Sequence, residues 1–425
     1  MTRPEREALL AWLFARQRFG MHPGLRRMRQ LLACLGDPHE RYRSVLVGGT
    51  NGKGSTAAVL AAALHAGGER VGLTTSPHLQ NLVERVAVDG EAVEEEALLD
   101  GLAHVRPHAE RVGATFFETV TAMAMLMFAE AGVTTAVLEV GMGGRFDATN
   151  VVEPVLSLVT SVALDHTAVL GDSLRAIAHE KAGIFRAGTP AWTGSEGEAL
   201  ACLHEAAAAT QVVLQALVED ADVQVRDLGW QGLELAVAVG GRRLAAHTPL
   251  VGAHQAGNVA LALIAADTLG VPASAAAGAA ALTRWPGRLE RVAHRRRWRV
   301  LDGAHTPAAA AALARALQVL EGRVPVLVLG ISQDKDVAGV VSALAPAAER
   351  IIATRAASSP RALAPSELAR LAEARPVDNL PDAIELAIRW TGPEDVIVVA
   401  GSLFLAGEAR ALARGEPGEG RERWQ

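Results

Sequence analysis

Residues 49–55 read Gly49-Thr50-Asn51-Gly52-Lys53-Gly54-Ser55 and point to the architecture of the whole chain. Residues 44–47 (Ser-Val-Leu-Val) before them, rich in β-branched side chains, predict a strand, and the alanine-rich residues 56–65 after them predict a helix. A glycine-rich turn between a strand and a helix points backbone N–H groups at an anion, and the helix dipole favours negative charge there. Lys53 adds a cation for phosphate oxygens, and Ser55 a hydroxyl for Mg²⁺. The stretch therefore predicts a nucleoside triphosphate site.

The spacing in this stretch differs from that of the standard P-loop, which has four residues between its glycines and Ser or Thr directly after Lys. Here Gly54 separates Lys53 from Ser55, and Gly49 lies three residues before Gly52. A glycine-rich turn alone is weak evidence, because glycine is common in turns of every kind. The flanking strand and helix, with the added Lys and Ser, favour a nucleotide site over a plain turn.

Composition limits the class of protein. At 425 residues the chain is too long for one ordinary core, so we expect two or three domains. The formal net charge of −6 argues against a nucleic-acid partner, and we interpret the basic residues 294–297 as a solvated linker or turn. Two cysteines, Cys34 and Cys202, give neither a metal-site spacing nor a disulfide framework. With no secretory segment and no apolar run of about 18 residues, we expect a soluble cytoplasmic protein without a membrane partner.

Alternating strand and helix patterns predict a P-loop-type domain with a mostly parallel sheet and helices on both faces. Two helices are expected within residues 5–36, and residues 219–250 break the alternation with a β-ribbon. Further strands are expected at 71–75, 134–140 and 155–162, and further helices at 117–131 and 258–269.

A second, smaller Rossmann-like α/β domain is predicted after residues 285–288 (Trp-Pro-Gly-Arg), where the alternation restarts. We therefore predict an N-terminal domain at 1–288 and a C-terminal domain at 289–425. In the latter we expect a helix at 307–320 and strands at 299–301, 326–329, 350–354 and 395–400.

Further motifs follow the predicted strand ends, where an α/β fold places its chemistry. In order they are Thr-Ser-Pro-His-Leu at 75–79, Gly-Gly-Arg-Phe-Asp-Ala-Thr-Asn at 143–150, Glu-Lys-Ala-Gly-Ile at 180–184, His-Gln at 254–255, Trp-Pro-Gly-Arg-Leu-Glu at 285–290, Asp-Gly-Ala-His at 302–305, Asp-Lys-Asp at 334–336 and Gly-Ser-Leu at 401–403. Together with residues 49–55, this series resembles the Mur ligase superfamily, and most closely its folate branch. The resemblance covers most of the chain.

The resemblance implies an ATP-dependent amide ligase with two Mg²⁺ sites. In that chemistry a substrate carboxylate attacks the γ-phosphate of ATP, and the amine of L-glutamate then attacks the acyl phosphate. The protein contributes positioning and charge neutralisation. The branch includes folylpolyglutamate synthase and dihydrofolate synthase, so the implied small-molecule substrates are ATP, L-glutamate and a folate or dihydropteroate. We expect a monomer.

Residue roles follow from the resemblance position by position. The implied catalytic residues are Lys53, His166 and Lys181. The nucleotide contacts are residues 49–55 with Asn258, Arg288, Asp302 and His305. The metal ligands are Ser55, Ser76, Glu139 and His166, and the folate or pterin contacts are Phe117, Arg145 and Asp147.

Lys181 matches a lysine that the family carries as a carbamate. An ammonium beside two divalent cations is repelled, whereas a carbamate is an anion that binds metal or positions the acyl phosphate. The alternative is a surface lysine on a helix.

Plainer roles stay open for the other positions. Ser76 is also a candidate helix cap before Pro77, Glu139 an ion-paired acid, His166 a loop histidine and Asp147 a turn-stabilising residue. Residues 334–336 are either a polar loop or part of a glutamate site. Three departures from the family pattern, Thr306, Leu82-Val83 and Phe404, lie outside the proposed metal ligands.

Three other functions compete with the folate ligase. A ligase of cell-wall precursors would carry a domain of roughly 100 residues before the P-loop, whereas 48 residues precede Gly49. A catalytically silent nucleotide-binding module does not explain the set Lys53, Glu139, His166 and Lys181. A simple P-loop kinase does not explain the second domain.

Overall fold

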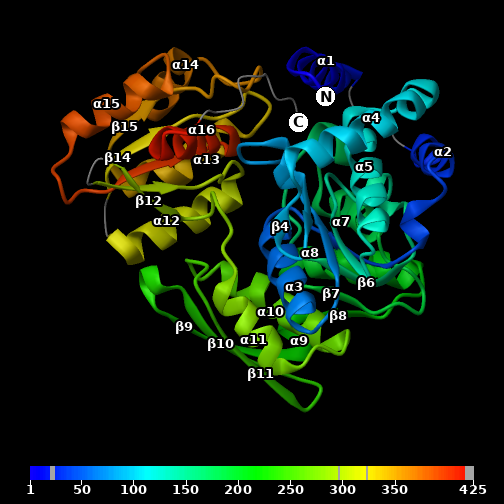
Figure 1. Ribbon diagram of the computed structural model, residues 1–425. Coiled ribbons are helices and arrows are strands. Elements are labelled where there is room, and N and C mark those ends of the chain that lie inside the picture. The colour runs from blue at the N-terminus through cyan, green and yellow to red at the C-terminus, as the bar shows by residue number, and fades with distance from the viewer. Residues whose placement is uncertain (20–23, 295–296, 322–323, 417–425) are drawn as a thin grey trace.

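The computed structural model describes residues 1–19, 24–294, 297–321 and 324–416. They form two α/β units, each built around its own sheet, and an antiparallel ribbon beside the first unit (Figure 1). The predicted fold class is confirmed. The boundary between residues 288 and 289 stays a prediction, and the second sheet begins at Glu290. Part of the basic run at 294–297 lies outside the described residues.

The first sheet has eight strands, and six neighbouring strands, from β2 to the edge strand β8, are parallel. In spatial order the strands are β4 (Glu91–Ala92), β3 (Val86–Val88), β2 (Val71–Thr74), β5 (Thr135–Glu139), β1 (Arg43–Gly48), β6 (Pro154–Val159), β7 (Ala191–Thr193) and β8 (Leu214–Ala216). Strands β3 and β4, which lie together at one edge of the sheet, run antiparallel to their neighbours. The central strands are almost continuously apolar, because helices cover both faces of the sheet.

Side chains of β1 alternate between two hydrophobic cores. Leu46 packs into one core, with α1 (Arg3–Ala15), α2 (Arg26–Cys34), α4 (Glu95–Val112), α5 (Phe116–Glu130), α7 (Leu174–Ala182) and α8 (Gly197–Ala209). Val45 and Val47 point the other way, toward α3 (Lys53–Ala66), α10 (Gln255–Thr268) and α11 (Ala273–Leu282). This period of two fixes which helices lie on which face.

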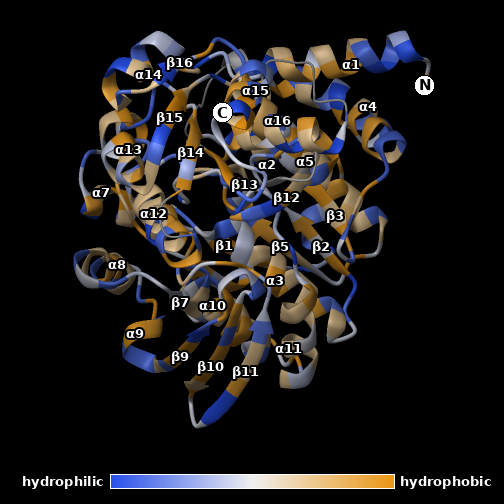
Figure 2. Cartoon of the chain, turned by 90° about the vertical axis from the view of Figure 1, so that its left-hand side faces the viewer, coloured by the Kyte–Doolittle hydropathy of each residue, from blue (hydrophilic) through white to orange (hydrophobic). Residues whose placement is uncertain are grey.

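The predicted ribbon has three strands rather than two: β9 (Ala221–Asp227), β10 (Leu233–Val239) and β11 (Arg242–Thr248). Gly240 and Gly241 join β10 to β11 with φ of 55° and 75°, as a tight hairpin turn requires. Leu233, Leu235 and Val237 bury one face of the ribbon against the first unit. Figure 2 shows the ribbon below α10, with a hydrophilic end.

The second unit has six strands, ordered β12 (Glu290–His294), β13 (Arg297–Leu301), β17 (Ile397–Ala400), β14 (Val324–Leu329), β15 (Ala348–Ala353) and β16 (Arg375–Pro376). All pairs but β12–β13 are parallel. One face is covered by α12 (Pro307–Glu321), α13 (Val337–Leu344) and α14 (Pro365–Ala372), and the other by α15 (Leu380–Trp390) and α16 (Leu403–Arg414).

Three boundaries differ from the prediction by three residues, and one of them is the start of α10, at Gln255 rather than 258. The other two differences lie at the P-loop. Helix α3 begins at Lys53, three residues earlier than expected. Strand β6 ends at Val159 rather than 162, because the hydroxyls of Thr160 and Ser161 donate to Asn51 O at 2.6 and 3.1 Å. The chain therefore leaves the sheet early and supports the P-loop.

None of the helices that the structure describes is long and apolar enough to cross a membrane. The short helices α6 (Thr167–Leu170) and α9 (Leu217–Asp220) complete the α-helices of the first unit.

Gly72 tests how tightly α5 is packed on the first sheet. A Cβ at this buried β2 position would lie 2.7 Å from ring atoms of Phe128 on α5. We expect Gly72→Ala to destabilise the fold by about 1–3 kcal/mol, because the ring has to move within a close-packed core. Urea unfolding measures the change.

Gly278 is the matched control, because it lies on the exposed side of α11, where a Cβ would have no atom within 4 Å. Gly278→Ala should stabilise the fold by up to about 1 kcal/mol through helix propensity. Equal effects of the two substitutions would contradict the packing argument.

Candidate active site

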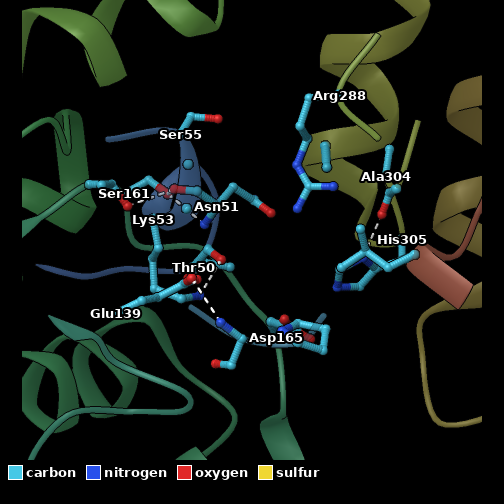
Figure 3. Close-up of a pocket in the computed structure, with 18 of the residues that line it drawn as sticks. Thr50, Asn51, Lys53, Ser55, Glu139, Ser161, Asp165, Arg288, Ala304 and His305 are labelled. Carbon is cyan, nitrogen blue, oxygen red and sulfur yellow. Dashed lines mark hydrogen bonds between the residues drawn. The ribbon is translucent and has the colours of Figure 1, made fainter. Parts of the chain in front are cut away.

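A cavity of about 630 Å³ lies where residues of the two units meet. On the first unit it is lined by residues at or just after the ends of β1, β2, β5 and β6, because parallel strands end at the same edge of a sheet. On the second unit it is lined by residues that follow β13 and by α12. Figure 3 shows Arg288 and His305 facing Asn51 and Lys53 across the space.

The P-loop is held by its glycines and by the end of β6. Gly49 has φ of 137°, and a Cβ there would lie 2.0 Å from Thr160 Oγ1. Gly52 has φ of 88°, and a Cβ there would lie 2.0 Å from Asn258 Oδ1. Both positions therefore require glycine on two counts. Lys53 Nζ donates to Gly49 O and Thr50 O at 3.2 Å each, so the loop surrounds the cation.

Every predicted nucleotide contact except Gly49 lines this cavity. Asp302 accepts hydrogen bonds from the N–H groups of Leu289 and Ala304, both at 2.8 Å, which fixes its carboxylate. His305 Nδ1 donates to Gly303 O at 2.7 Å. Burial, followed by the charge of Lys335, lowers the pKa of His305 to about 4, so its imidazole is neutral at pH 7.

The four predicted metal ligands also line the cavity. Glu139 is buried and accepts a hydrogen bond from Ser76 N at 3.0 Å. Burial raises the pKa of Glu139, although Lys53 opposes the rise, and a buried carboxylate is costly without a neighbouring cation. One carboxylate and two hydroxyls suit Mg²⁺, which takes its other ligands from phosphate and water.

Among the described residues, no group of three or more His, Cys, Asp or Glu side chains could hold a metal ion without ligands from phosphate or water. His166 stands in the left-handed region with φ of 50°. Burial, followed by Lys335, lowers its pKa to about 4, which leaves the neutral imidazole that binds metals.

An ion pair joins the two units beside His166. Lys335, from the loop before α13, donates to Asp165 Oδ1 at 2.8 Å, and both side chains are largely buried. Burial raises the pKa of Asp165, but His166 and Lys335 outweigh it and lower the pKa to about 2. The sequence leaves the role of residues 334–336 open between a polar loop and a glutamate site. Of these residues, Lys335 reaches the site.

Lys181 is buried on α7, so the alternative of a surface lysine is wrong. Its Nζ donates to Gly49 O at 2.8 Å, and it lines a small second cavity with Gly49, Lys53 and His166. Burial, followed by the charge of Lys53, lowers the pKa of Lys181 to about 7. Near neutral pH a substantial fraction of this side chain is therefore the uncharged amine.

The predicted folate contacts are not all brought together. Phe117 and Asp147 line the large cavity. Asp147 accepts hydrogen bonds from Met142 N at 2.9 Å and Thr149 N at 3.0 Å, so the turn-stabilising role is present. Arg145 lines neither cavity and pairs with Glu180 at 3.8 Å.

Several lining residues were absent from the prediction. They are Arg16, Gln17, Arg85, Thr115 and Phe116 at one end, Thr160 and Ser161 near the P-loop, and Ala308, Ala309, Ala312 and Leu313 on α12. The sequence offers no local signal for the α12 residues. A compositional signal exists for Lys335, because the chain has three lysines among its 41 basic residues and all three, Lys53, Lys181 and Lys335, meet at this site.

The departures from the family pattern also have structural places. Thr306 accepts a hydrogen bond from Asn51 Nδ2 at 3.5 Å, so it still connects the second unit to the P-loop. Leu82 and Val83 lie in a 3₁₀ turn that ends at Arg85. Phe404 is buried in the second unit, in the core between its sheet and helices α15 and α16.

The loop after β2 rests on the second unit. A Cβ on Gly407 of α16 would lie 2.0 Å from Leu79 O, so only glycine allows this approach. Gln80 is buried, accepts a hydrogen bond from Arg410 and donates to Glu416 at 3.0 Å. The loop that carries Ser76 is thus held by both units.

Two family descriptions match the chain. Residues 47–266 match the Mur ligase middle domain, and residues 287–403 match the Mur ligase glutamate ligase domain. The solved Mycobacterium tuberculosis folylpolyglutamate synthase has 32% identity and a TM-score of 0.88, covering 97% of this chain and 100% of that one.

Curated relatives agree with this match. A probable bifunctional folylpolyglutamate synthase/dihydropteroate synthase of Haloferax volcanii is 40% identical over 94% of this chain, which spans about half the length of that relative (49%). The folylpolyglutamate synthase of Lacticaseibacillus casei is 36% identical, with 92% of this chain and 94% of the relative covered. The chain therefore belongs to the Mur ligase family, and its similarity to folylpolyglutamate synthases extends over most of its length.

Proposed function

We propose that this chain is an ATP-dependent ligase that adds L-glutamate to a folate and releases ADP and phosphate. The observation that carries the proposal is the large cavity, which joins a P-loop and the buried Glu139 of one unit to Arg288, Asp302 and His305 of the other. Structures of relatives with ADP, and with AMPPNP and a Mn ion, support the use of a nucleotide and a divalent metal.

The chemistry divides between the two units. The P-loop N–H groups and Lys53 bind the phosphates while a folate carboxylate attacks the γ-phosphorus, which breaks the bond to ADP and forms an acyl phosphate. The amine of glutamate then attacks the acyl carbon, loses a proton and expels phosphate. Arg288 adds positive charge where negative charge accumulates, and His305 is neutral.

Two Mg²⁺ sites are part of the proposal. Ser55 and Glu139 would hold one ion, and Ser76, Glu139 and His166 the other. Bound Mg²⁺ supplies charge neutralisation at the phosphates. The support is the donor set itself, a buried carboxylate with hydroxyls on the cavity wall.

Lys181 is proposed to act as its carbamate. The neutral amine attacks CO₂, a C–N bond forms and a proton leaves, which turns a buried cation into an anion. The pKa near 7 supports this step, because it makes the amine nucleophilic at neutral pH, and the repulsion from Lys53 is relieved by the change of sign.

We also propose a monomer, since all proposed site residues come from one chain, with domains at 1–288 and 289–425. A reducing compartment such as the cytoplasm is consistent with the free cysteines Cys34 and Cys202.

The main test is a turnover assay with ATP, Mg²⁺, glutamate and either tetrahydrofolate or dihydropteroate, with products identified by mass. We expect a mass gain of one glutamate per ADP formed. Lys53→Ala should lose more than about nine-tenths of this activity while its circular dichroism and thermal midpoint stay near wild type, because Lys53 binds phosphate charge and adds little to the core. ATP turnover that does not depend on glutamate would contradict the ligase and favour another nucleotide-dependent activity.

The carbamate is tested by ¹³C-bicarbonate NMR. Because the chain has only three lysines, any lysine carbamate signal is assigned by replacing each with arginine. We expect one signal, lost in Lys181→Arg and kept in Lys53→Arg and Lys335→Arg. The signal should grow as pH rises through about 7, because the uncharged amine is the reactive form above the depressed pKa.

Activity gives the second readout for the carbamate. Lys181→Ala should be nearly inactive and partly rescued by small carboxylates, whereas Lys181→Arg should stay inactive. An unmodified Lys181 in a fully active, ligand-bound enzyme would rule out the carbamate.

The second synthase activity is tested at Asp147, which lines the cavity and whose carboxylate is a candidate partner for a pterin ring N–H and amino group. Asp147→Ala should impair dihydropteroate glutamylation more than folate glutamylation, as measured by the ratio of kcat/KM values. Thr149→Val is the control, because it removes the 2.7 Å hydrogen bond to Asp147 but leaves the carboxylate. Equal losses on both substrates in Asp147→Ala would leave only a structural role.

A further inference from the structure

The N-terminal helices have no part in the chemistry described so far, yet they reach the cavity. Helix α1 continues into the 3₁₀ turn η1 (Arg16–Phe19), and α2 follows. Figure 1 shows α1 and α2 on the side of the first unit that carries α4 and α5. Arg16 and Gln17 line the cavity at the end where Phe116 and Phe117 also lie.

Arg16 holds the corner between α4 and α5. Its side chain is buried, with 8% exposed; Nε donates to Ala114 O at 2.8 Å and Nη2 donates to Ala109 O at 2.9 Å. These carbonyls are at the C-terminal end of α4, where a cation also interacts favourably with the helix dipole. The guanidinium lies 4.8 Å from the ring centroid of Trp12, which limits its movement.

A second arginine holds the other side of the same corner. Arg27 of α2 pairs with Glu118 at 3.1 Å, and Glu118 Oε2 accepts a hydrogen bond from Thr115 N at 2.8 Å. Thr115 is the N-cap of α5 and accepts a hydrogen bond from Glu118 N in return. The first turn of α5 is therefore fixed by charged groups from η1 and from α2.

This corner carries the aromatic wall of the cavity. The ring of Phe116 lies 5.6 Å from that of Phe14, and the guanidinium of Arg85 lies 5.2 Å from the Phe116 ring. Phe117 covers Gly141, where a Cβ would lie 2.6 Å from the ring. A shift of the α4–α5 corner would therefore move both rings relative to the loop that follows Glu139.

We infer that Arg16 is a positioning residue for the folate substrate, and that it acts by fixing the aromatic wall at Phe116 and Phe117. The inference rests on the proposed function for the identity of the ligand. It assigns a role to the N-terminal helices. They shape the end of the cavity that carries Phe116 and Phe117, and they leave the nucleotide end unchanged.

The test compares Arg16→Met, which keeps the length of the side chain without its donors, with Arg16→Lys, which keeps the charge. Calorimetry gives the Kd of tetrahydrofolate in the presence of ADP and Mg²⁺, and the Kd of ADP alone. We expect the folate Kd to rise about tenfold in Arg16→Met, with a smaller rise in Arg16→Lys, because charged hydrogen bonds of this kind are lost in whole or in part. The Kd of ADP should change less than about twofold.

Arg106→Ala is the matched control. Arg106 also lies over Trp12, at 5.2 Å, but is not among the residues that line the cavity. It should leave both Kd values at wild type. If Arg16→Met does not fold, Arg27→Met decides, because Arg27 is more exposed and holds the same corner through Glu118; its folate Kd should rise while its ADP Kd stays.

A folded variant whose folate Kd is unchanged, or whose folate and ADP Kd values rise together, would overturn the inference. The wild type could instead bind folate but show no glutamate-dependent turnover, while Arg16→Met binds folate more weakly. That outcome would contradict the proposed function and leave the inference standing. A wild type that binds no folate would overturn both.

Discussion

The close approach of Thr160 and Asn258 to the backbone at Gly49 and Gly52 is the constraint on which the site depends. Each glycine leaves no room for a Cβ, since Thr160 and Asn258 already lie where it would be. The P-loop is thus held between the end of β6 and the start of α10, and its N–H groups are fixed before a ligand arrives. Lys53 and Lys181 both donate to Gly49 O, so the same peptide also sets the positions of two cations.

Few acidic side chains offset the positive charge of the cavity. Three of these carboxylates are fixed by hydrogen bonds or an ion pair. Glu139 is fixed by Ser76 N, Asp302 by two backbone N–H groups and Asp165 by Lys335. Burial, followed by nearby lysine charge, lowers the pKa values of His166, His305 and Lys181, which favours their uncharged forms. A strongly anionic ligand such as a nucleoside triphosphate complements this arrangement.

Local pattern was enough to predict the fold class and most strands, because apolar periodicity and strand–turn–helix chemistry act over short distances. The ends of β6 and α3 were misplaced because their boundaries depend on hydrogen bonds between Asn51 and Thr160, which are about a hundred residues apart. Apart from Asn258 on α10 and Arg288 before β12, the proposed nucleotide and metal residues lie at or after strand ends, and they were predicted as a set. Arg16 and the α12 wall were not, because only the packed structure brings them to the cavity. Arg145 lies in the expected motif, but it pairs with Glu180 and does not line the cavity.

The distribution of basic residues has a practical consequence. All other cationic side chains of the chain are arginines, so the ε-amines of the protein are confined to one cavity. Reagents that acylate or reductively methylate primary amines therefore find no other lysine side chain as a target outside that region. Lys181 and the side chain of Lys335 are largely buried, so we expect them to react more slowly than the partly exposed Lys53. The extent of labelling at each lysine therefore reports how accessible this region is to solvent.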